Sequence, residues 1–535
     1  MKLQFKPVYL ASIAIMAIGC TKEVTENDTS EISEVPTELR AAASSFYTPP
    51  GQNVRANKKN LVTDYGVNHN DQNDDSSKLN LAIKDLSDTG GILTLPKGKY
   101  YLTKIRMRSN VHLEIEKGTV IYPTKGLTPA KNHRIFDFAS KTEEKIENAS
   151  IVGKGGKFIV DLRGNSSKNQ IVADVGNVTN FKISNFTIKD EKTIFASILV
   201  SFTDKAGNAW PHKGIIENID QANAHTGYGL IQAYAADNIL FNNLSCTGGV
   251  TLRLETDNLA MKTAKKGGVR DIFATKIKNT NGLTPVMFSP HFMENGKVTI
   301  DDVTAIGCAY AVRVEHGFIE IFDKGNRASA DAFKNYIEGI LGAGSVEVVY
   351  KRNNGRTWAA RIANDFNEAA YNHSNPAVSG IKPGKFATSK VTNVKATYKG
   401  TGAKLKQAFL SYLPCSERSK VCRPGPDGFE YNGPSLGVTI DNTKRDNSLG
   451  NYNVNVSTSS VQGFPNNYVL NVKYNTPKVC NQNLGSITSC NMSLSHVVIY
   501  WRLLIKAWIS SGVNIGLAPS LPATIALCSY AQAKS

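Results

Sequence analysis

The chain lacks several common signatures, and each absence narrows what it could be. Its eight cysteines include no Cys-x-x-Cys pair, so the usual ligand spacing of a structural zinc site is missing. The formal net charge is +17, yet no helix-turn-helix, zinc-finger or RNA-binding signature and no basic run accompanies it. We therefore expect no nucleic-acid partner. An exported basic protein would instead meet a polyanion outside the cytoplasm, such as a sulfated or uronic-acid polysaccharide.

Acidic residues are absent from residues 491–535, where the composition changes abruptly. Within this tail the apolar segment Val497–Ile509 is interrupted by Arg502 and Lys506. The segment is too short and too charged for a transmembrane helix, which needs about 20 apolar residues. A membrane-active helix, a non-native reading frame and a poorly folded end all remain open.

The first twenty residues have the composition of an export signal. Two lysines precede an apolar stretch at residues 8–18, which ends at Gly19-Cys20. A small residue before a single cysteine resembles a bacterial lipoprotein cleavage site, so we predict that Cys20 carries a lipid anchored in the outer membrane. An ordinary secretory peptide or a membrane anchor are the alternatives. Residues 21–55 are predicted to be an acidic disordered tether, because residues 21–40 carry six acids and two bases without apolar periodicity.

The cysteine spacing supports export. Cys415 and Cys422 are close in sequence within a loop rich in Pro, Gly and charge, and Cys480 and Cys490 are close within another loop. We predict that each pair forms a short local disulfide in an oxidising compartment.

Residues 56–120 predict the start of a coil of short strands. Apolar residues recur at helical spacing after Ser76, which predicts a helix there. Turns at Gly90-Gly91 and Pro96-Lys97-Gly98 then separate short strands that continue to Tyr122. This order resembles the first coil of right-handed parallel β-helix proteins of the pectin-degrading type, in which the helix covers the open end of the coil.

A loose repeat then follows. The form apolar-polar-polar-apolar recurs from Ile183, Ile216, Phe241 and Ile300, with a looser copy at Phe273, and successive copies lie roughly 25 to 33 residues apart. A β-sandwich would also have short strands with Asn and Gly turns, but it would not explain this spacing. The predicted fold class is therefore all-β, a right-handed parallel β-helix.

Residues 319–388 interrupt the repeat with helical patterns on both sides of one strand. The predicted organisation is a β-helix over residues 56–318, a small inserted α/β domain over residues 319–388 and the rest of the β-helix over residues 389–490. Basic residues in the insertion form a loop that could close over an anionic substrate or simply face solvent: Lys351, Arg352 and Arg356.

The stretch Thr251–Asn258 carries the strongest chemical signal. Leu252 and Leu254 alternate with charged residues, as in a half-buried strand, so Glu255 and Asp257 would project from the same face about 6.5 Å apart. Inverting glycosidases hold their two carboxyl groups about 6.5–9.5 Å apart, which leaves room for a water beside the sugar. A solvated polar face is the more common meaning of such a pair taken alone.

The sequence as a whole resembles the iota-carrageenases, inverting β-helix glycoside hydrolases that cut sulfated red-algal galactans. The resemblance covers roughly residues 56–480 and is most specific in Arg253-Leu-Glu255-Thr-Asp257-Asn, with Gln232 before it and His291 after it. The strand Ala311–His316 also fits. The resemblance fails over the tail from residue 491.

The resemblance implies a role for each of these residues. Glu255 would be the general acid, its pKa raised by the neighbouring carboxylate, and Asp257 would be the general base that activates water. Gln232 and His291 would line the same cleft. Arg253 and Arg313 would bind sulfate groups, because a guanidinium binds tetrahedral oxyanions through two hydrogen bonds.

The implied partner is a sulfated polysaccharide, and the implied state is a monomer. No cofactor is expected for the chemistry, while a structural calcium or sodium ion would be compatible with the sequence, although no motif marks its ligands. The alternatives are a polysaccharide lyase, a polygalacturonase-like enzyme acting on another anionic polysaccharide, and a non-catalytic surface protein that binds glycans.

Overall fold

The computed structural model describes residues 45–490 except 130, 324–325, 352–356, 424–430, 445–448, 450 and 482–486. The predicted export signal with Cys20, most of the predicted tether, the tail from residue 491, and Arg352 and Arg356 of the basic loop lie outside the described residues. No helix within the described ranges is long and apolar enough to cross a membrane.

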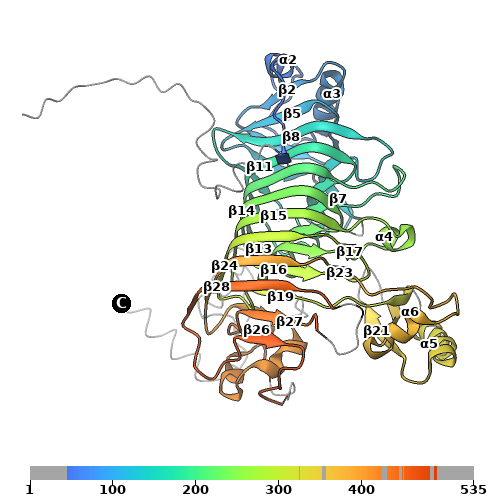
Figure 1. Ribbon diagram of the computed structural model, residues 1–535. Coiled ribbons are helices and arrows are strands. Elements are labelled where there is room, and N and C mark those ends of the chain that lie inside the picture. The colour runs from blue at the N-terminus through green and yellow to red at the C-terminus, as the bar shows by residue number, and fades with distance from the viewer. Residues whose placement is uncertain are drawn as a thin grey trace, which may run out of the picture. The chain divides into compact units, whose positions relative to one another are not determined.

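The fold is a parallel β-helix, which confirms the predicted class. Within the described residues, 22 strands join into one sheet whose neighbours pair in parallel, and Figure 1 shows them stacked as successive coils. The coil strands are β1 (Lys58–Asn60), β2 (Gly91–Leu95), β3 (Lys99–Leu102), β4 (Ile105–Arg106), β5 (Val111–Glu116), β6 (Val120–Pro123), β7 (His133–Phe138), β8 (Ile146–Lys154), β9 (Phe158–Asp161), β10 (Gln170–Val175), β11 (Val178–Lys189), β12 (Ile198–Val200), β13 (His212–Ala233), β14 (Ala236–Glu255), β15 (Val269–Thr280), β16 (Thr284–Ser289), β18 (Val298–Ile306), β19 (Val312–Val314), β24 (Ser389–Thr397), β27 (Thr439–Asp441), β28 (Val454–Gln462) and β29 (Asn471–Lys473).

The helix predicted after Ser76 is α3 (Ser76–Ser87), and it packs against β2, β4 and β5 at the first coil (Figure 1). Its apolar stripe is buried, so the helix covers the end of the apolar interior. The ordered chain begins earlier than predicted: α2 spans Gln52–Ala56, and the buried ring of Phe46 packs 5.2 Å from the ring of Phe273. The last residues of the predicted tether are therefore structured, because Phe46 buries an apolar ring against the coil.

The loose repeat marks one corner of the coil. In each copy the second polar residue adopts a left-handed backbone conformation, which Asn and Asp tolerate better than most side chains. The apolar residues on either side turn inward and are buried. The corner residues with positive φ are Asn185, Asn218, Asn243, Lys276, Asp302 and Asn393. The side-chain amide of Asn243 donates to Asn218 Oδ1 at 2.8 Å, so neighbouring corners are linked.

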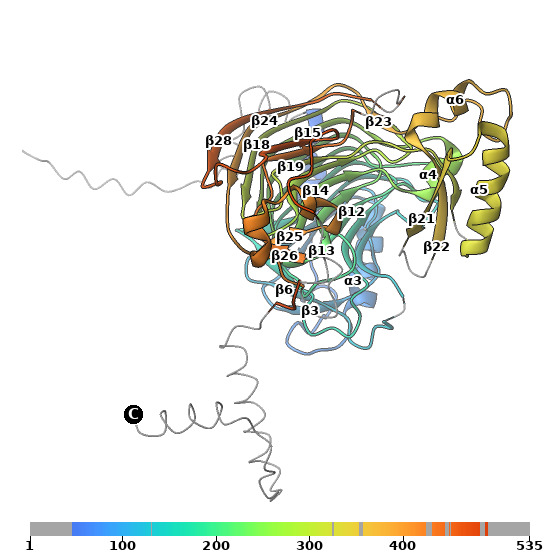
Figure 2. The ribbon, with the colours of Figure 1, turned by 90° about the horizontal axis from the view of Figure 1, so that it is seen from below.

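The interruption after residue 318 contains helices and an antiparallel sheet of order β20-β22-β21. The sheet and the long helix enclose a small apolar core that includes Ile319, Ile337, Val346 and Ile362. Figure 2 shows α5, α6, β21 and β22 beside the coil. The elements are β20 (Glu320–Asp323), α5 (Arg327–Leu341), β21 (Val346–Lys351), β22 (Thr357–Ile362), η2 (Asn364–Phe366) and α6 (Asn367–Asn372), and β23 (Lys385–Phe386) pairs with β17 (Glu294–Asn295) as the chain returns.

The predicted disulfide partners are wrong, although all four cysteines are bonded. The structure pairs Cys415 with Cys480 and Cys422 with Cys490, with Cα–Cα distances of 5.3 and 4.8 Å. The reason is topological: the segment before Cys490 returns beside the earlier loop, where Cys490 N donates to Arg423 O at 2.7 Å. Neighbours in the sequence are therefore not neighbours in space here. The adjoining elements are β25 (Ala403–Leu405), η3 (Gln407–Tyr412), η4 (Cys415–Lys420) and β26 (Tyr431–Gly433).

A cavity of about 610 Å³ lies where the coil interior ends, between β28 and the pair β27 and β29. Val314 on β19 is paired in register with Asp441 on β27, and Asp441 with Lys473 on β29, so an apolar inward position becomes charged in successive coils. The interior thus becomes polar in its last coils. None of the residues predicted to act in catalysis lines this cavity.

Candidate active site

Strand register brings three of the predicted site residues, Gln232, Arg253 and Arg313, into one line. Gln232 on β13 is paired with Arg253 on β14, Arg253 with Met287 on β16, and Met287 with Arg313 on β19. The alternate positions Leu252 and Leu254 are fully buried in the core, as predicted. Because neighbouring strands are about 4.8 Å apart, the coil holds these side chains at regular intervals on a rigid surface.

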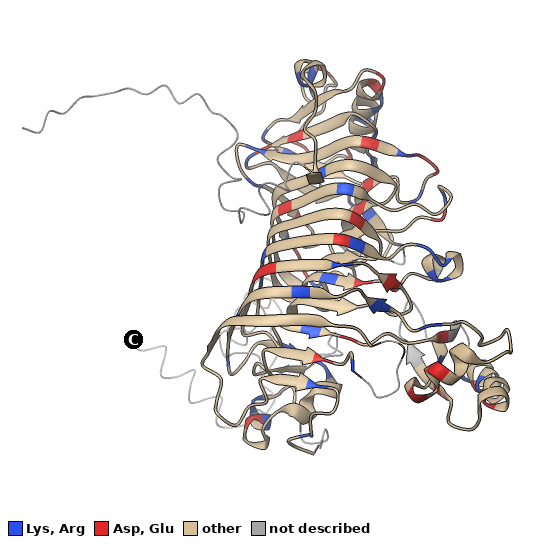
Figure 3. Cartoon of the chain, viewed as in Figure 1, with Lys and Arg blue, Asp and Glu red and all other residues tan. Residues whose placement is uncertain are grey.

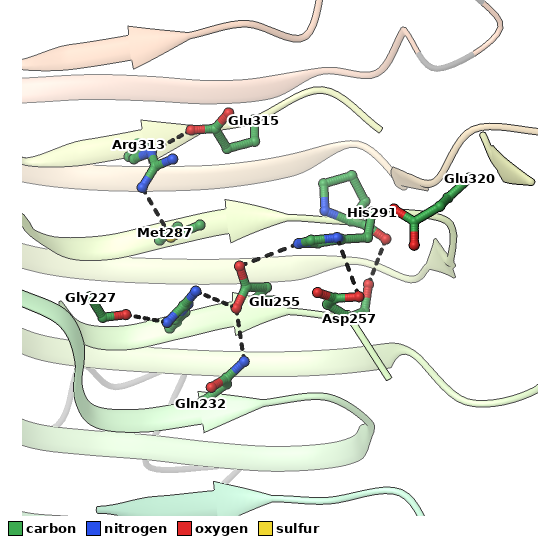
Figure 4. A network of polar contacts seen from close by, with 12 residues as sticks. Gly227, Gln232, Glu255, Asp257, Met287, His291, Arg313, Glu315 and Glu320 are labelled. Atoms are coloured by element: carbon green, nitrogen blue, oxygen red, sulfur yellow. Dashed lines mark hydrogen bonds and ion pairs between the residues drawn. The ribbon is translucent and has the colours of Figure 1, made fainter. Parts of the chain in front are cut away.

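Glu255 is the centre of a network of polar contacts (Figure 4). Its Oε2 accepts hydrogen bonds from Gln232 Nε2 at 2.8 Å and from Arg253 Nη2 at 2.5 Å, while Oε1 lies 3.3 Å from His291 Nε2. The Glu255 side chain is only 10% exposed. The carboxylate is therefore held in one orientation by three partners.

This network contradicts the pKa expected for Glu255. Burial alone would raise the pKa of the carboxyl, but the charges of Arg253 and His291, with their hydrogen bonds, outweigh burial and hold the pKa of Glu255 well below its usual range. The predicted rise caused by the neighbouring acid is therefore wrong, since these contacts lower the pKa instead. The surroundings of Glu255 thus favour its carboxylate form.

The prediction that Asp257 lies on the same strand as Glu255 is wrong. β14 ends at Glu255, and the side chain of Asn258 caps helix α4 (Leu259–Ala264) by accepting from the backbone N–H groups of Ala260 and Met261. Thr256, between the two acids, is fixed by a hydrogen bond from its Oγ1 to Pro290 O at 2.7 Å. The strand end, the threonine anchor and the helix cap together position Asp257.

His291 contacts both acids. Its Nδ1 lies 3.6 Å from Asp257 Oδ1, and its Nε2 faces Glu255, so the two carboxylates meet different nitrogens of one ring (Figure 4). The backbone of His291 has a φ of 48°, a conformation uncommon for residues other than glycine. Phe318 packs edge-on against the ring with centroids 4.8 Å apart.

Arg313 lies two strands beyond Arg253, and its ion-pair partner is Glu315 rather than Glu255. It forms an ion pair with Glu315, approaches Met287 Sδ at 3.7 Å and lies over the ring of Phe409 with 5.2 Å to the centroid. Its side chain is 7% exposed. Arg253-x-Glu255 and Arg313-x-Glu315 are thus two similar ion pairs on the same face of the coil.

The sequence did not reveal the support behind His291. Arg361, from the inserted segment, lies 3.7 Å from the centroid of the Phe318 ring, and its Nε donates to Glu320 Oε2 at 3.2 Å. Glu320 is almost fully buried and also lies 4.0 Å from Lys262 Nζ on α4. The sequence pattern of the insertion does not predict these contacts, because they depend on how the inserted segment packs against the coil.

The chain is similar to known proteins over most of its length. No family model matches the chain. It is 40% identical over 510 residues to the iota-carrageenase of Alteromonas macleodii, covering 92% of this chain and 97% of that protein. The chain belongs to the iota-carrageenase family.

Solved structures of the family have the same fold. An iota-carrageenase complexed to iota-carrageenan fragments is 39% identical with a TM-score of 0.76, and the match covers 84% of this chain and 98% of that one. An iota-carrageenase of glycoside hydrolase family 82 from A. fortis, solved in the absence of chloride ions, is 39% identical with a TM-score of 0.76. The match covers 85% of this chain and 97% of that one. Family membership thus extends over nearly the whole length of its relatives.

Among the described residues, no group of three or more His, Cys, Asp or Glu side chains has the arrangement of a metal site. The polar groups that meet at the site are carboxylates, an imidazole, an amide and a guanidinium. These groups can transfer protons, orient a water and bind an oxyanion.

Proposed function

We propose that this member of the iota-carrageenase family hydrolyses internal β-1,4 linkages of iota-carrageenan with inversion of configuration. The observation that carries the proposal is the pair Glu255 and Asp257, both in contact with His291, in a chain 40% identical to a curated iota-carrageenase. Hydrolysis of this substrate is the activity for which those relatives are named.

Each residue has a distinct task in the proposed reaction. Asp257, whose side chain is 27% exposed, accepts a proton from the attacking water, and Glu255 donates a proton to the leaving oxygen. Gln232 and His291 orient the Glu255 carboxyl from opposite oxygens. Because the surroundings of Glu255 favour its ionised form, Glu255 must gain a proton before the glycosidic bond breaks.

The first test is the stereochemistry of the product. Proton NMR of iota-carrageenan during the first minutes of digestion should show the α-anomer at the new reducing end, because water attacks the β-linkage from the opposite face. Initial β-anomer would show retention and would remove Asp257 from the role of base. Unsaturated uronate absorbance, measured in parallel, would indicate a lyase, and an absence of new reducing ends would indicate a binding protein.

The second test concerns Arg313, which we propose binds a substrate sulfate together with Arg253. Arg313→Ala alone would leave Glu315 as an unpaired buried charge, so the better variant is Arg313→Met with Glu315→Gln. We expect KM to rise and its salt dependence to weaken, since salt shortens the Debye length to about 3 Å at 1 M. Measuring KM over a salt series, with Glu315→Gln alone as the control, decides it. A salt response equal to that of the wild type would remove Arg313 from the sulfate-binding residues.

The charge distribution supports recognition of sulfate by individual basic residues in the site rather than by a broad basic surface. On the face drawn in Figure 3, basic and acidic residues are interspersed along the coil. The positive charges that matter would therefore be those placed in the site, such as Arg253.

The two disulfides are compatible with an exported protein, because such bonds persist in oxidising compartments. We propose further that the protein is a monomer held at the outer membrane by a lipid on Cys20. The residue context of Cys20 supports the anchor, and globomycin-sensitive processing of the wild type but not of Cys20→Ser would test it.

A further inference from the structure

Glu255 can act as an acid only when it carries a proton, and its surroundings oppose this. Oε2 accepts from two N–H donors, Arg253 Nη2 at 2.5 Å and Gln232 Nε2 at 2.8 Å. A proton on Oε2 would point at these donors and find no acceptor. While Arg253 stays in place, these two donors favour the ionised form of Glu255.

Arg253 is not fully satisfied in this position. Its Nη1 donates to Gly227 O, and its guanidinium lies 5.9 Å from the centroid of the Tyr228 ring. Its Nε is buried and has no hydrogen-bond partner among the described residues. A buried donor without a partner is unfavourable, so a ligand that accepts from Nε and Nη2 together would stabilise the side chain.

A sulfate group is such a ligand. Two of its oxygens match the fork formed by Nε–H and Nη2–H of a guanidinium, and its charge competes with a carboxylate for the same donors. Nη2 carries two N–H groups, but a sulfate on this fork places a second anion on the same guanidinium. Sulfate binding therefore weakens the Arg253–Glu255 ion pair, and the nearby negative charge opposes ionisation of Glu255.

We propose that a sulfate group of the bound substrate takes Arg253 away from Glu255 and so allows Glu255 to take up the proton that it later donates. The inference rests on the proposed function and adds to its specificity. Sulfation of the substrate would raise kcat as well as the affinity of binding. The proton comes from solvent on binding and passes to the leaving oxygen. Asp257 takes another proton from the attacking water and returns it to solvent after the products leave, so the protons balance.

Other groups around Glu255 do not replace Arg253 in this role. Glu255 faces three residues from β13 and its C-terminal end: Gln232, Tyr228 and Tyr234. Gln232 is neutral, and burial raises the pKa of both tyrosines, so neither supplies charge. His291, beyond β16, contacts the other oxygen. Asp257, on the same segment as Glu255, is also acidic and does not favour ionisation of Glu255. Arg253 is the group that is both permanently charged and bonded to Oε2.

Calorimetry can count the proton. Asp257→Asn should bind an iota-carrageenan oligosaccharide without cleaving it, and titrations in buffers of different ionisation enthalpy report the protons exchanged. We expect uptake of about one proton per oligosaccharide between about pH 5 and 7, because the Glu255 pKa is low before binding and higher afterwards. By the same linkage, affinity should fall as the pH rises through that window.

Two controls make the result specific. The double variant Glu255→Gln/Asp257→Asn should bind without proton uptake, and a chemically desulfated oligosaccharide of the same length should bind Asp257→Asn without uptake. Binding of the sulfated chain without uptake, or uptake that persists in the double variant, overturns the inference. The proposed function would still stand if the wild type cleaves iota-carrageenan with inversion, and it fails separately if the wild type does not.

Kinetics supply an independent check. The basic limb of kcat reports the acid in the enzyme–substrate complex, and that of kcat/KM reports the free enzyme. For the wild type we expect the kcat limb at a higher pH than the kcat/KM limb. Arg253→Gln, which cannot hold Glu255 ionised, should bring the two limbs together. Coincident limbs in the wild type would also overturn the inference.

Discussion

Glu255→Gln is expected to lower kcat on iota-carrageenan by about 10²–10⁴-fold, the usual contribution of general acid–base catalysis. The amide has the shape of the carboxyl and can still accept from Gln232 or Arg253, so folding and KM should change little. What is lost is the proton given to the leaving oxygen in the transition state. Initial rates over a substrate series, with KM and kcat resolved, measure the effect.

Glu217→Gln is a matched control for that variant. Glu217 also lies on a coil strand, β13, and forms an ion pair with Lys182 at 2.9 Å, but it contacts none of the site residues. It should keep wild-type kcat. A substrate with an aryl leaving group that needs no protonation should restore the Glu255→Gln rate. A variant that keeps more than about a tenth of kcat on the polymer would show that Glu255 is not the acid.

The fold could be predicted because its rules are local and repeated. The corner at Asn218 needs a residue that tolerates positive φ between two inward apolar residues, and the same need recurs one coil later at Asn243. The apolar stripe after Ser76 likewise predicts α3 without knowledge of its neighbours. Such features are visible in any sequence window of a few residues.

The site was only partly predictable, because its chemistry depends on contacts between distant coils. The pattern around Leu252 and Leu254 correctly predicted which way Glu255 points. It could not show that Asn258 ends the strand early by capping a helix, nor that His291 returns to contact Glu255. For this reason the expected rise in the Glu255 pKa was wrong: contacts with Arg253 and with His291, which comes from another coil, lower the pKa of Glu255.

The prediction of the disulfide pairing failed for the same reason. Cys415 and Cys480 are 65 residues apart, a separation that no local spacing rule would select. In a solenoid, each coil places segments of distant sequence side by side, so proximity in sequence is a poor guide to loop contacts.

Asp257→Ala is expected to lower kcat by about 10²–10⁴-fold as well, but for a different reason, which the products can reveal. Removing the carboxylate leaves the water without a base and opens space beside the sugar. A small anion such as azide needs no base, so it should attack from that space, raise the rate and give an α-glycosyl azide.

The matched comparison is Glu255→Ala, in which Asp257 still occupies the space on the inverting face, so azide should neither accelerate the reaction nor appear in the product. The double variant should be little slower than the slower single variant, because acid and base act in one concerted step and their losses do not add. Mass spectrometry and NMR of the products measure both. A β-glycosyl azide from Asp257→Ala would show net retention and would remove Asp257 from the role of base in an inverting reaction. An α-glycosyl azide from Glu255→Ala but not from Asp257→Ala would assign the two carboxylates the other way round, since only loss of the residue that activates water leaves room for a nucleophile on the inverting face.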